Sequence, residues 1–328
     1  MKSAGQAALV RLEGASYRYR SGRTGVTDIT LEVGPGERVV LMGPNGSGKT
    51  TVLRLIAGEL RPAGGTVHVM DRTATRLTGA QRRSMGVAPA ESVHLDALPA
   101  RRNALFFARA AGLSPDRAEA AVDRLFERFG LAADTDIPPR EYSYGMSRKL
   151  LLIEALAHEP VLLLLDEPTL GLDPSARKTL LDLLHRRAHD GASVVAAFNG
   201  PTDALALASR VVFLLGGRVV ANDTPDALLA RLAKRTLITI EVDGPMSKEA
   251  DYPEGVTVSQ TQGGLLATSE FGPGVLPALC QAVLASGRTI RSVRVKEPDL
   301  ADVFAHLTGQ HLAPPTRSGD PSSPGAAR

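Results

Sequence analysis

A glycine-rich run holds the residues most able to do chemistry: Gly43, Pro44, Asn45, Gly46, Ser47, Gly48, Lys49 and Thr50, followed by Thr51. It fits the pattern GxxxxGK[ST] and stands, as that pattern requires, between a strand-like and a helix-like segment. Glycines let backbone N–H groups turn toward a polyphosphate, and the start of the helix adds a partial positive charge. Lys49 would neutralise the β- and γ-phosphates, and the Thr50 hydroxyl would bind Mg²⁺. The alternative is a glycine-rich turn with a chance lysine.

Two carboxylates supply the second half of such a site. Asp166 and Glu167 follow Val161 to Leu165, an apolar run with the length of a buried strand. Asp166 is placed to hold a Mg²⁺-bound water, and Glu167 to polarise the water that attacks the phosphate. The alternative is a pair of solvated acids at the end of a strand.

Strands and helices that would position these residues alternate along most of the chain. Strands are expected at Val26 to Val33, Glu37 to Met42, Val161 to Leu165, Ser193 to Ala197 and Arg210 to Leu215. Helices are expected at Lys49 to about Ala57, Pro115 to Phe129 with Ser114 as N-cap, Tyr144 onward, and Pro225 to Lys234. This alternation predicts an α/β fold, with a largely parallel sheet covered by helices on both faces.

The pattern changes after residue 230. Short strands are expected at Thr236 to Val242, Val256 to Ser259, Leu265 to Ser269 and Thr289 to Val295, and helices at Val275 to Ala285 and Leu300 to Leu307. In the last helix Leu300, Val303, Phe304 and Leu307 share one face, which we expect to be buried. The sequence thus predicts a small C-terminal α+β domain over 235–311. A tail rich in Pro, Ser and Gly over 312–328 is expected to be disordered.

Length and composition limit the function further. A chain of 328 residues predicts about two domains, and its net charge of +3 is too small to indicate a nucleic-acid partner. No apolar run reaches the roughly 20 residues that span a membrane, and the N-terminus lacks the apolar core of a secretory signal, so a cytosolic location is expected. The single cysteine, Cys280, excludes an intramolecular disulfide and a cysteine-cluster metal site.

Three further segments carry a resemblance to a known family. They are Tyr142 to Met146, Leu165 to Thr169 and Gly171 to Pro174, which stand in the places of that family's signature motif, its Walker B segment and the loop after it. The run GPNGSGKTT is also the form of phosphate loop that the family uses. Over about 8–230 the chain therefore resembles the ATP-binding subunit of an ABC transporter. The resemblance implies a P-loop NTPase core of the ABC ATPase type, with an inserted helical subdomain at about 91–150.

The resemblance also implies how ATP and Mg²⁺ would be bound. In that family two ATP-binding subunits sandwich two ATP molecules, so Ser143 and Gly145 would contact the γ-phosphate of an ATP held mainly by the partner. Asp173 would lie at the dimer interface. Tyr144 replaces the first glycine of the family's pair and crowds the contact. The alternative is that Tyr142 to Met146 is only a helix start.

An aromatic residue before the first strand pair stacks on adenine in this family. Tyr19 is the better match and Tyr17 the second, with core packing as the alternative for both.

Two positions depart from the family, and both concern hydrolysis. Ala90 stands where a glutamine is expected, and alanine can neither ligate Mg²⁺ nor hold the attacking water. Glu91 would take over if the loop shifted by one residue; the alternative for Glu91 is an exposed loop acid. Asn199 replaces a histidine that contacts the γ-phosphate; asparagine is shorter and neutral but can donate one hydrogen bond.

Each such loss can cost about 10²–10³ in rate. The phosphate-loop residues, Asp166 and Glu167 are all retained. The sequence therefore predicts a site that binds Mg-ATP well and hydrolyses it slowly.

The segment from Val295 to Gly309 resembles the C-terminal part of daunorubicin-resistance-type drug exporter ATPases, where it belongs to a small regulatory or dimer-stabilising domain. Ordinary helix punctuation by Pro298 and Gly309 is the alternative. The leading hypothesis is an exporter motor subunit, peripheral on the cytoplasmic face of the membrane. Its expected partners are a second ATP-binding subunit, identical or different, and a separate multi-spanning permease contacted by the helical region.

Two other functions are alternatives to this one. A regulatory or assembly subunit that binds ATP without useful hydrolysis is favoured by Ala90 and Asn199 and disfavoured by Glu167 and the exporter-like C-terminus. A DNA-repair or ribosome-associated ABC ATPase is disfavoured because the sequence shows neither a coiled-coil insert nor a second ATP-binding unit.

Overall fold

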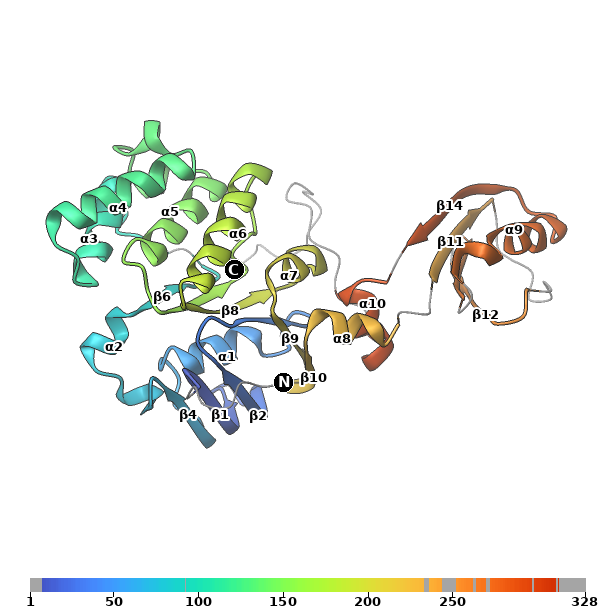
Figure 1. Ribbon diagram of the computed structural model, residues 1–328, viewed down its shortest axis with the longest axis horizontal. Helices are drawn as coiled ribbons and strands as arrows, with labels where there is room; N and C mark the ends of the chain where they lie inside the picture. The colour runs from blue at the N-terminus through green and yellow to red at the C-terminus, as the bar shows by residue number, and fades with distance from the viewer. Residues whose placement is uncertain are drawn as a thin grey trace. The chain divides into compact units, whose positions relative to one another are not determined.

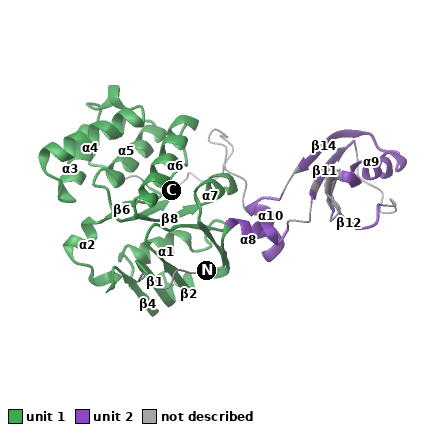
Figure 2. Ribbon diagram, in the orientation of Figure 1, with its two compact units in different colours: residues 1–224, 311–328 green, residues 225–310 purple. Residues whose placement is uncertain are grey.

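The computed structural model describes residues 8–91, 93–232, 236–243, 252–261, 264–269, 272–296, 298–310 and 312. The chain divides into two compact units, residues 1–224 with 311–328 and residues 225–310 (Figure 2). The sequence placed the end of the first unit at 230. The structure instead groups α8 (Pro225–Ala230) with the second unit, where α8 packs on α10 (Leu300–Thr308). Apart from residue 312, the tail over 312–328 lies outside the described residues.

An antiparallel sheet opens the first unit (Figure 1), in the order β2-β1-β4-β5. Its strands are β1 (Val10–Arg18), β2 (Thr24–Val33), β4 (Gly64–Val69) and β5 (Arg72–Thr73). Only β2 was predicted. In β1 the apolar side chains alternate imperfectly, because the register shifts after Leu12 and again at Ala15 and Tyr17.

The second sheet carries the functional strand ends, in the order β10-β9-β3-β8-β7-β6. Its strands are β3 (Arg38–Met42), β6 (Met85–Ala88), β7 (Leu162–Asp166), β8 (Ser193–Phe198), β9 (Arg210–Leu215) and β10 (Arg218–Asp223). All pairs are parallel except β9 with β10, as predicted for a largely parallel sheet. Every residue of β7 and β8 is buried, which suits strands covered on both faces. The carboxyl ends of β3, β7 and β8 therefore meet at one edge.

Helices surround this sheet. They are α1 (Lys49–Ile56), α2 (Gly79–Arg83), α3 (Ala100–Ala110), α4 (Pro115–Arg128), α5 (Tyr144–Leu156), α6 (Pro174–His189) and α7 (Pro201–Leu207), with short 3₁₀ turns at Ala74–Arg76, Ala132–Asp134 and Pro139–Glu141. Figure 1 shows α3, α4 and α5 as one helical group, and these three pack on one another. Ser114 occupies the N-cap position of α4, as predicted, although its side chain makes no capping hydrogen bond there.

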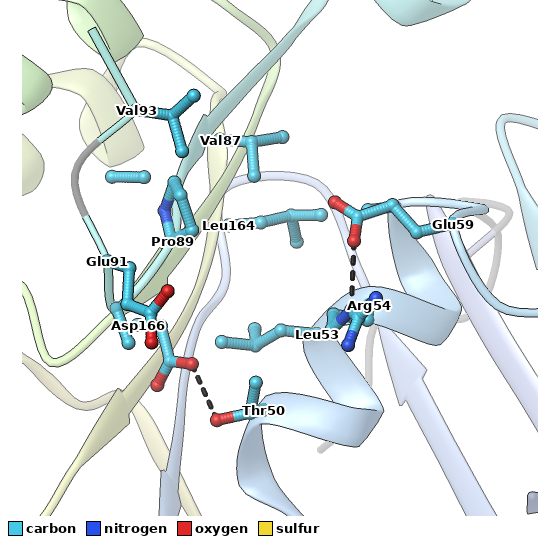
Figure 3. Close-up of a pocket in the computed structure, with 13 residues that line it drawn as sticks. Thr50, Leu53, Arg54, Glu59, Val87, Pro89, Glu91, Val93, Leu164 and Asp166 are labelled. Atoms are coloured by element: carbon cyan, nitrogen blue, oxygen red, sulfur yellow. Dashed lines mark hydrogen bonds and ion pairs between the residues drawn. The ribbon is translucent and has the colours of Figure 1, made fainter. Parts of the chain in front are cut away.

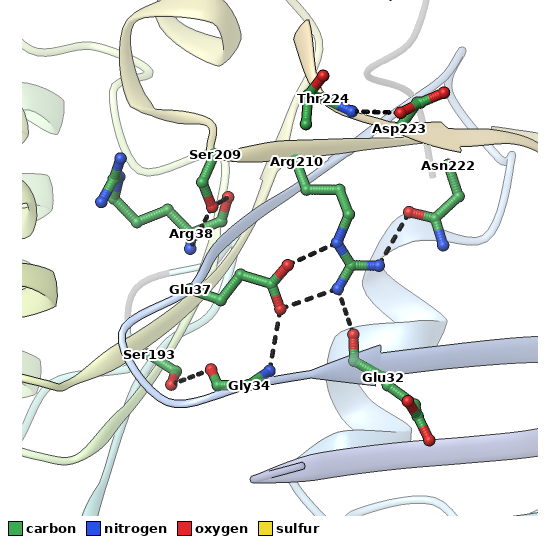
Figure 4. Close-up of polar contacts among 10 residues, drawn as sticks. All are labelled: Glu32, Gly34, Glu37, Arg38, Ser193, Ser209, Arg210, Asn222, Asp223 and Thr224. Carbon is green, nitrogen blue, oxygen red and sulfur yellow. Dashed lines mark hydrogen bonds and ion pairs between the residues drawn. The ribbon is translucent and has the colours of Figure 1, made fainter. Parts of the chain in front are cut away.

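Arg210, at the start of β9 in the second sheet, connects this strand by hydrogen bonds to the end of β2 in the first sheet (Figure 4). Its guanidinium donates to both carboxylate oxygens of Glu37, at 2.6 and 2.9 Å, to the side chain of Asn222 and to the main-chain carbonyl of Glu32. Glu37 also accepts the N–H of Gly34 at 2.9 Å. Such a bidentate, partly buried pair fixes the β2–β3 turn, and with it the strand that leads into the phosphate loop.

The second unit holds an antiparallel sheet in the order β12-β13-β11-β14. Its elements are β11 (Thr236–Val242), β12 (Val256–Thr261), β13 (Gly264–Ser269), β14 (Ile290–Lys296), α9 (Leu276–Ala285) and a 3₁₀ turn at Gly272–Val275. Ile238, Ile240 and Leu265 of the sheet form a buried core with Leu279 and Val283 of α9.

Helix α10 begins at Leu300, as predicted. Asp299 is its N-cap and forms a capping box with Asp302, so Pro298 precedes the helix and does not start it. Leu300, Val303 and Phe304 are fully buried, but Leu307 in the last turn is 36% exposed. Among the described residues no helix is both long and apolar enough to span a membrane.

Candidate functional site

The phosphate loop folds as the sequence predicts because two glycines adopt conformations closed to other residues. Gly43 has φ +155°, and a Cβ there would lie 2.2 Å from the carbonyl oxygen of Leu214. Gly48, the N-cap of α1, has φ +108°, and a Cβ would lie 2.7 Å from Val26. Gly48 offers no side-chain cap, so the first N–H groups of α1 are left to an external acceptor.

Lys49 lies along the floor of the loop. Its ammonium group donates to the carbonyl oxygens of Gly43 at 2.7 Å and Pro44 at 3.3 Å, and to Oδ1 of Asn199 at 2.8 Å. Burial lowers the pKa of Lys49, and the charges of Glu167 and Asp166 oppose that shift. All three acceptors of the ammonium group are uncharged, so a phosphate would be its first anionic hydrogen-bond acceptor.

The cavity above this loop fits a nucleotide polyphosphate. It has a volume of about 470 Å³ and is lined by most of the predicted site: Tyr19, Asn45, Gly46, Ser47, Gly48, Lys49, Thr50, Thr51, Asp166, Glu167 and Asn199. The Ser47 hydroxyl is buried and has no hydrogen-bond partner among the described residues. The unpaired Ser47 hydroxyl, the uncapped start of α1 and the ammonium group of Lys49 all belong to one cavity. Together they would suit a ligand rich in hydrogen-bond acceptors.

Thr50 and Asp166 meet as a metal site requires. The Thr50 hydroxyl donates to Oδ2 of Asp166 at 2.6 Å. Burial raises the pKa of Asp166, against the opposing effects of the Thr50 hydrogen bond, Lys49 and Arg148. In the described part of the chain no three His, Cys, Asp or Glu side chains gather into a metal cluster. This is the arrangement that suits Mg²⁺, which takes few protein ligands and completes its shell with water and substrate phosphate.

Glu167 sits at the edge of the cavity in a left-handed backbone conformation, with φ +50°. Its N–H donates to the carbonyl of Ala197 at 3.0 Å, and its Oε2 accepts the N–H of Asn199 at 3.3 Å. Burial raises the pKa of Glu167 to about 7; Lys49 opposes this shift and Asp166 adds to it. A carboxyl group titrating near neutrality is suited to exchange protons with water.

The two departures are visible in the geometry. Asn199 faces Lys49 with its carbonyl oxygen, so the amide accepts from the lysine. Ala90 lines the nucleotide cavity but carries no polar group.

Glu91 is exposed and lines a neighbouring cavity of about 350 Å³. Figure 3 shows Glu91, Asp166 and Thr50 along one side of this cavity and the Arg54–Glu59 ion pair on the other.

The structure separates the two tyrosines proposed to stack on adenine. Tyr19 lines the nucleotide cavity, its hydroxyl is 2.9 Å from Oγ1 of Thr51, and the guanidinium of Arg23 lies 5.3 Å from its ring centre. Tyr17 packs against the apolar core of the first unit and meets Tyr19 edge-on. Arg23, which also lines the cavity, was not predicted; its place near an aromatic residue was the only signal.

The signature residues lie outside the cavity that their own chain forms. Ser143 is the N-cap of α5 and accepts the N–H of Met146 at 3.2 Å. The Tyr144 side chain is 57% exposed and covers Gly171, where a Cβ would lie 2.4 Å from its ring. Gly145 approaches the same loop, and a Cβ there would lie 2.8 Å from the Gly171 carbonyl oxygen.

Asp173 joins the loop after β7 to the signature helix. It caps α6 by accepting the N–H of Ala176 at 2.9 Å, and its other oxygen pairs with Lys149 of α5 at 2.6 Å. The hydrogen bond from Lys149 is the largest cause of the lowered pKa of Asp173. The Lys149–Asp173 pair thus joins α5 to the loop after β7, and none of Ser143, Gly145 and Asp173 lines the nucleotide cavity.

Comparisons with known proteins agree with this geometry. Residues 26–170 match the family model described as ABC transporter. A daunorubicin resistance ATP-binding protein of Streptomyces coeruleorubidus is 33% identical over 303 residues, covering 92% of this chain and 96% of that protein. A fluoroquinolones export ATP-binding protein of Mycobacterium tuberculosis is 31% identical over 310 residues, covering 93% and 94%.

Solved structures match about two thirds of the chain. The structure of an ATP-binding subunit of an ABC transporter superposes with a TM-score of 0.64 at 29% identity, covering 68% of this chain and 92% of that one. A dimeric ATP-binding cassette in a post-hydrolysis state, at 24% identity and a TM-score of 0.61, shares the fold. Together with the relatives above, these matches show that the chain belongs to the ABC transporter family, as one of its ATP-binding ATPases.

Proposed function

We propose that this protein is the ATP-binding motor subunit of an exporter, and that ATP closes a dimer of such subunits on a separate membrane permease. The observation that carries the proposal is one cavity lined by Lys49, by the hydrogen-bonded pair of Thr50 and Asp166, and by Ser47, whose hydroxyl has no partner among the described residues. The names of the relatives, which concern daunorubicin resistance and fluoroquinolone export, support small-molecule drugs as cargo. The protein would then act at the cytoplasmic face of the membrane.

Each residue of the site has a defined task in this proposal. The loop N–H groups and Lys49 hold the β- and γ-phosphates, while Thr50 and Asp166 hold Mg²⁺, which supplies charge neutralisation when bound. Tyr19 offers its ring to the adenine. Glu167 orients the attacking water and takes up its proton.

Hydrolysis is slow in this proposal because two contacts of the transition state are weakened. Ala90 gives no ligand to the water or metal, and Asn199 is neutral where the family has a histidine. Losing one such contact costs about 10²–10³ in rate.

Steady-state hydrolysis by the purified full-length chain tests the proposal, together with Mg-ATP affinity. We expect tight binding with slow turnover, and loss of binding in Lys49→Met. Lys178→Met is the matched control, since the side chain of Lys178 is 77% exposed on α6. Absence of Mg-ATP binding would exclude the motor function. Turnover at the rate typical of the family would exclude only the prediction that hydrolysis is slow.

A regulatory or assembly subunit that binds ATP without useful hydrolysis is the second candidate. Ala90 and Asn199 favour it, because both stand where the family has residues that take part in hydrolysis. Adding the membrane partner in lipid vesicles separates the two functions: a motor subunit gains ATPase activity and a regulatory subunit does not.

A further inference from the structure

Among the residues that the structure describes, Arg148 is the largest fully buried side chain, with 1% of its surface exposed. It comes from α5, whose buried face is otherwise mostly apolar. Burial lowers its pKa, although nearby Tyr144, Asp166 and Glu167 oppose that effect. Placing a guanidinium in such a site is unfavourable unless hydrogen bonds compensate the loss of water. The position of Arg148 therefore calls for a reason beyond packing.

The guanidinium donates to four main-chain carbonyls from two separate segments. One terminal nitrogen, Nη1, reaches the carbonyl oxygens of Pro89 at 2.6 Å and Ala90 at 3.3 Å. The other, Nη2, reaches those of Asp166 and, at 2.9 Å, Glu167. One rigid, planar group thus joins the loop after β6 to the residues that hold the metal and the attacking water.

The backbone of Glu167 needs such support. Its φ of +50° is unfavourable for a residue with a side chain, and it persists only where surrounding contacts fix it. Arg148 holds the carbonyl of Glu167, while the Glu167 N–H is held by Ala197. Moving the guanidinium would release one of these two anchors.

The loop after β6 is itself fixed to α5 beyond Arg148. His94 contacts Glu154 at 3.2 Å and the Ser147 hydroxyl at 3.0 Å, with both His94 and Glu154 side chains about 5% exposed or less. A displacement of this loop would therefore be transmitted through α5 and Arg148 together.

We propose that Arg148 is a positioning residue that couples the loop at Pro89 and Ala90 to Glu167 through the main chain. In this way the loop affects catalysis although residue 90 has no polar side chain. The inference rests on the proposed function only in taking Glu167 as the residue that orients water.

Arg148→Lys tests the coupling, because lysine keeps the charge but cannot donate to both segments at once. Arg187→Lys is the matched control. Arg187 also donates to two main-chain carbonyls, those of Glu159 and Pro160, at 2.8 and 3.1 Å, and lines a cavity that shares no residue with the nucleotide cavity. We expect Arg148→Lys to lower kcat by about 10²-fold while KM for ATP changes less than about threefold. Arg187→Lys should leave both constants unchanged.

Hydrogen exchange of the nucleotide-free chain supplies a readout that does not need activity. In Arg148→Lys, amides of both 88–95 and 166–170 should exchange faster, and in Arg187→Lys neither should. If Arg148→Lys does not fold, Arg148→Met, which fills the same apolar surroundings, is measured in the same way. The inference is wrong if exchange changes in only one segment, or if the two lysine variants lose kcat equally. A wild-type chain without ATPase activity would overturn the proposed function, and the exchange experiment would still decide the coupling.

Discussion

Glu167 is the residue whose chemistry depends most directly on its surroundings. Burial keeps its carboxyl group protonated up to about pH 7, well above the ordinary range of a glutamate. The ionised form is the one that accepts a proton from water. Since the raised pKa favours the protonated acid at low pH, the active fraction grows as pH rises through about 7.

We therefore predict that kcat increases tenfold per pH unit below about pH 7 and levels off above it. Glu167→Gln should remove this dependence and lower kcat by at least about 10²-fold. Glu91→Gln is the control, because Glu91 is an exposed acid of the neighbouring loop. The pH profile of steady-state hydrolysis checks both variants. A changed profile in Glu91→Gln would show that Glu91 replaces the missing glutamine.

At Ala90 and Asn199 we predict that substitution raises the hydrolysis rate, in contrast to the loss expected for Glu167→Gln. Ala90→Gln places an amide in the cavity beside Thr50 and Asp166, and Asn199→His supplies a cation near the γ-phosphate. The double variant should raise kcat by about 10²-fold. Ala90→Leu with Asn199→Leu is the control of similar bulk, and it should not raise kcat. Single-turnover hydrolysis measures the chemical step, and a rate equal to that of wild type would contradict the assignment of these two residues.

Sequence predicts this site unevenly, for a physical reason. Within the phosphate loop, and again at the end of β7, the functional residues are consecutive in the chain, so a local sequence pattern is enough to predict how they lie. Arg148 contacts carbonyls 18 and 59 positions away, and only the packing of α5 brings them together. A lone arginine in an apolar helix was the available signal, and it says nothing about its partners.

Helix α5 joins the parts of the site at the scale of secondary structure. His94 docks on it through Glu154 and Ser147, Lys149 pairs with Asp173, and Ser143 caps its start. The helix was predicted because its apolar residues are numerous. Strands β1 and β4 were missed because bulges interrupt the alternation that would have revealed them.

The His94–Glu154 pair predicts a pattern of unfolding temperatures. His94→Leu leaves the buried Glu154 without this partner and should destabilise the protein by about 1–3 kcal/mol. His94→Leu with Glu154→Leu removes both polar groups and should recover most of that loss. Thermal unfolding of wild type, His94→Leu, Glu154→Leu and the double variant gives the interaction energy between the two side chains. Additive effects of the two single changes would contradict a direct contact between the two side chains.

The surface formed by Ser143, Gly145 and Asp173 concerns the whole molecule. These residues do not line the cavity proposed to bind the nucleotide of their own chain. A second copy, or a related subunit, would bring its phosphate loop to this surface. The family resemblance of the motifs implies this arrangement. Composition and hydrophobic periodicity alone would not have predicted a partner. Ser143 and Gly145 belong to one segment, whereas Asp173 follows Gly145 by 28 positions, and the Lys149–Asp173 pair joins the two segments.

The proposed sandwich predicts that one added negative charge prevents assembly. Ser143→Asp keeps an N-cap on α5, since aspartate caps as well as serine, but it opposes the phosphate of the partner's ATP. Ser114→Asp is the matched control, because Ser114 is likewise an exposed N-cap residue, on α4. Both changes are made in the Glu167→Gln chain, in which bound ATP persists.

Sedimentation with ATP and Mg²⁺ then measures the dimer. We expect Ser143→Asp to raise the dimer dissociation constant at least about tenfold, the effect of 1.4 kcal/mol. Ser114→Asp should have no effect, because its charge lies on a helix that the sandwich does not use. Equal dimerisation of the two variants would place the signature outside the interface. Loss of the dimer in both would show that charge in general, rather than the position of Ser143, controls assembly.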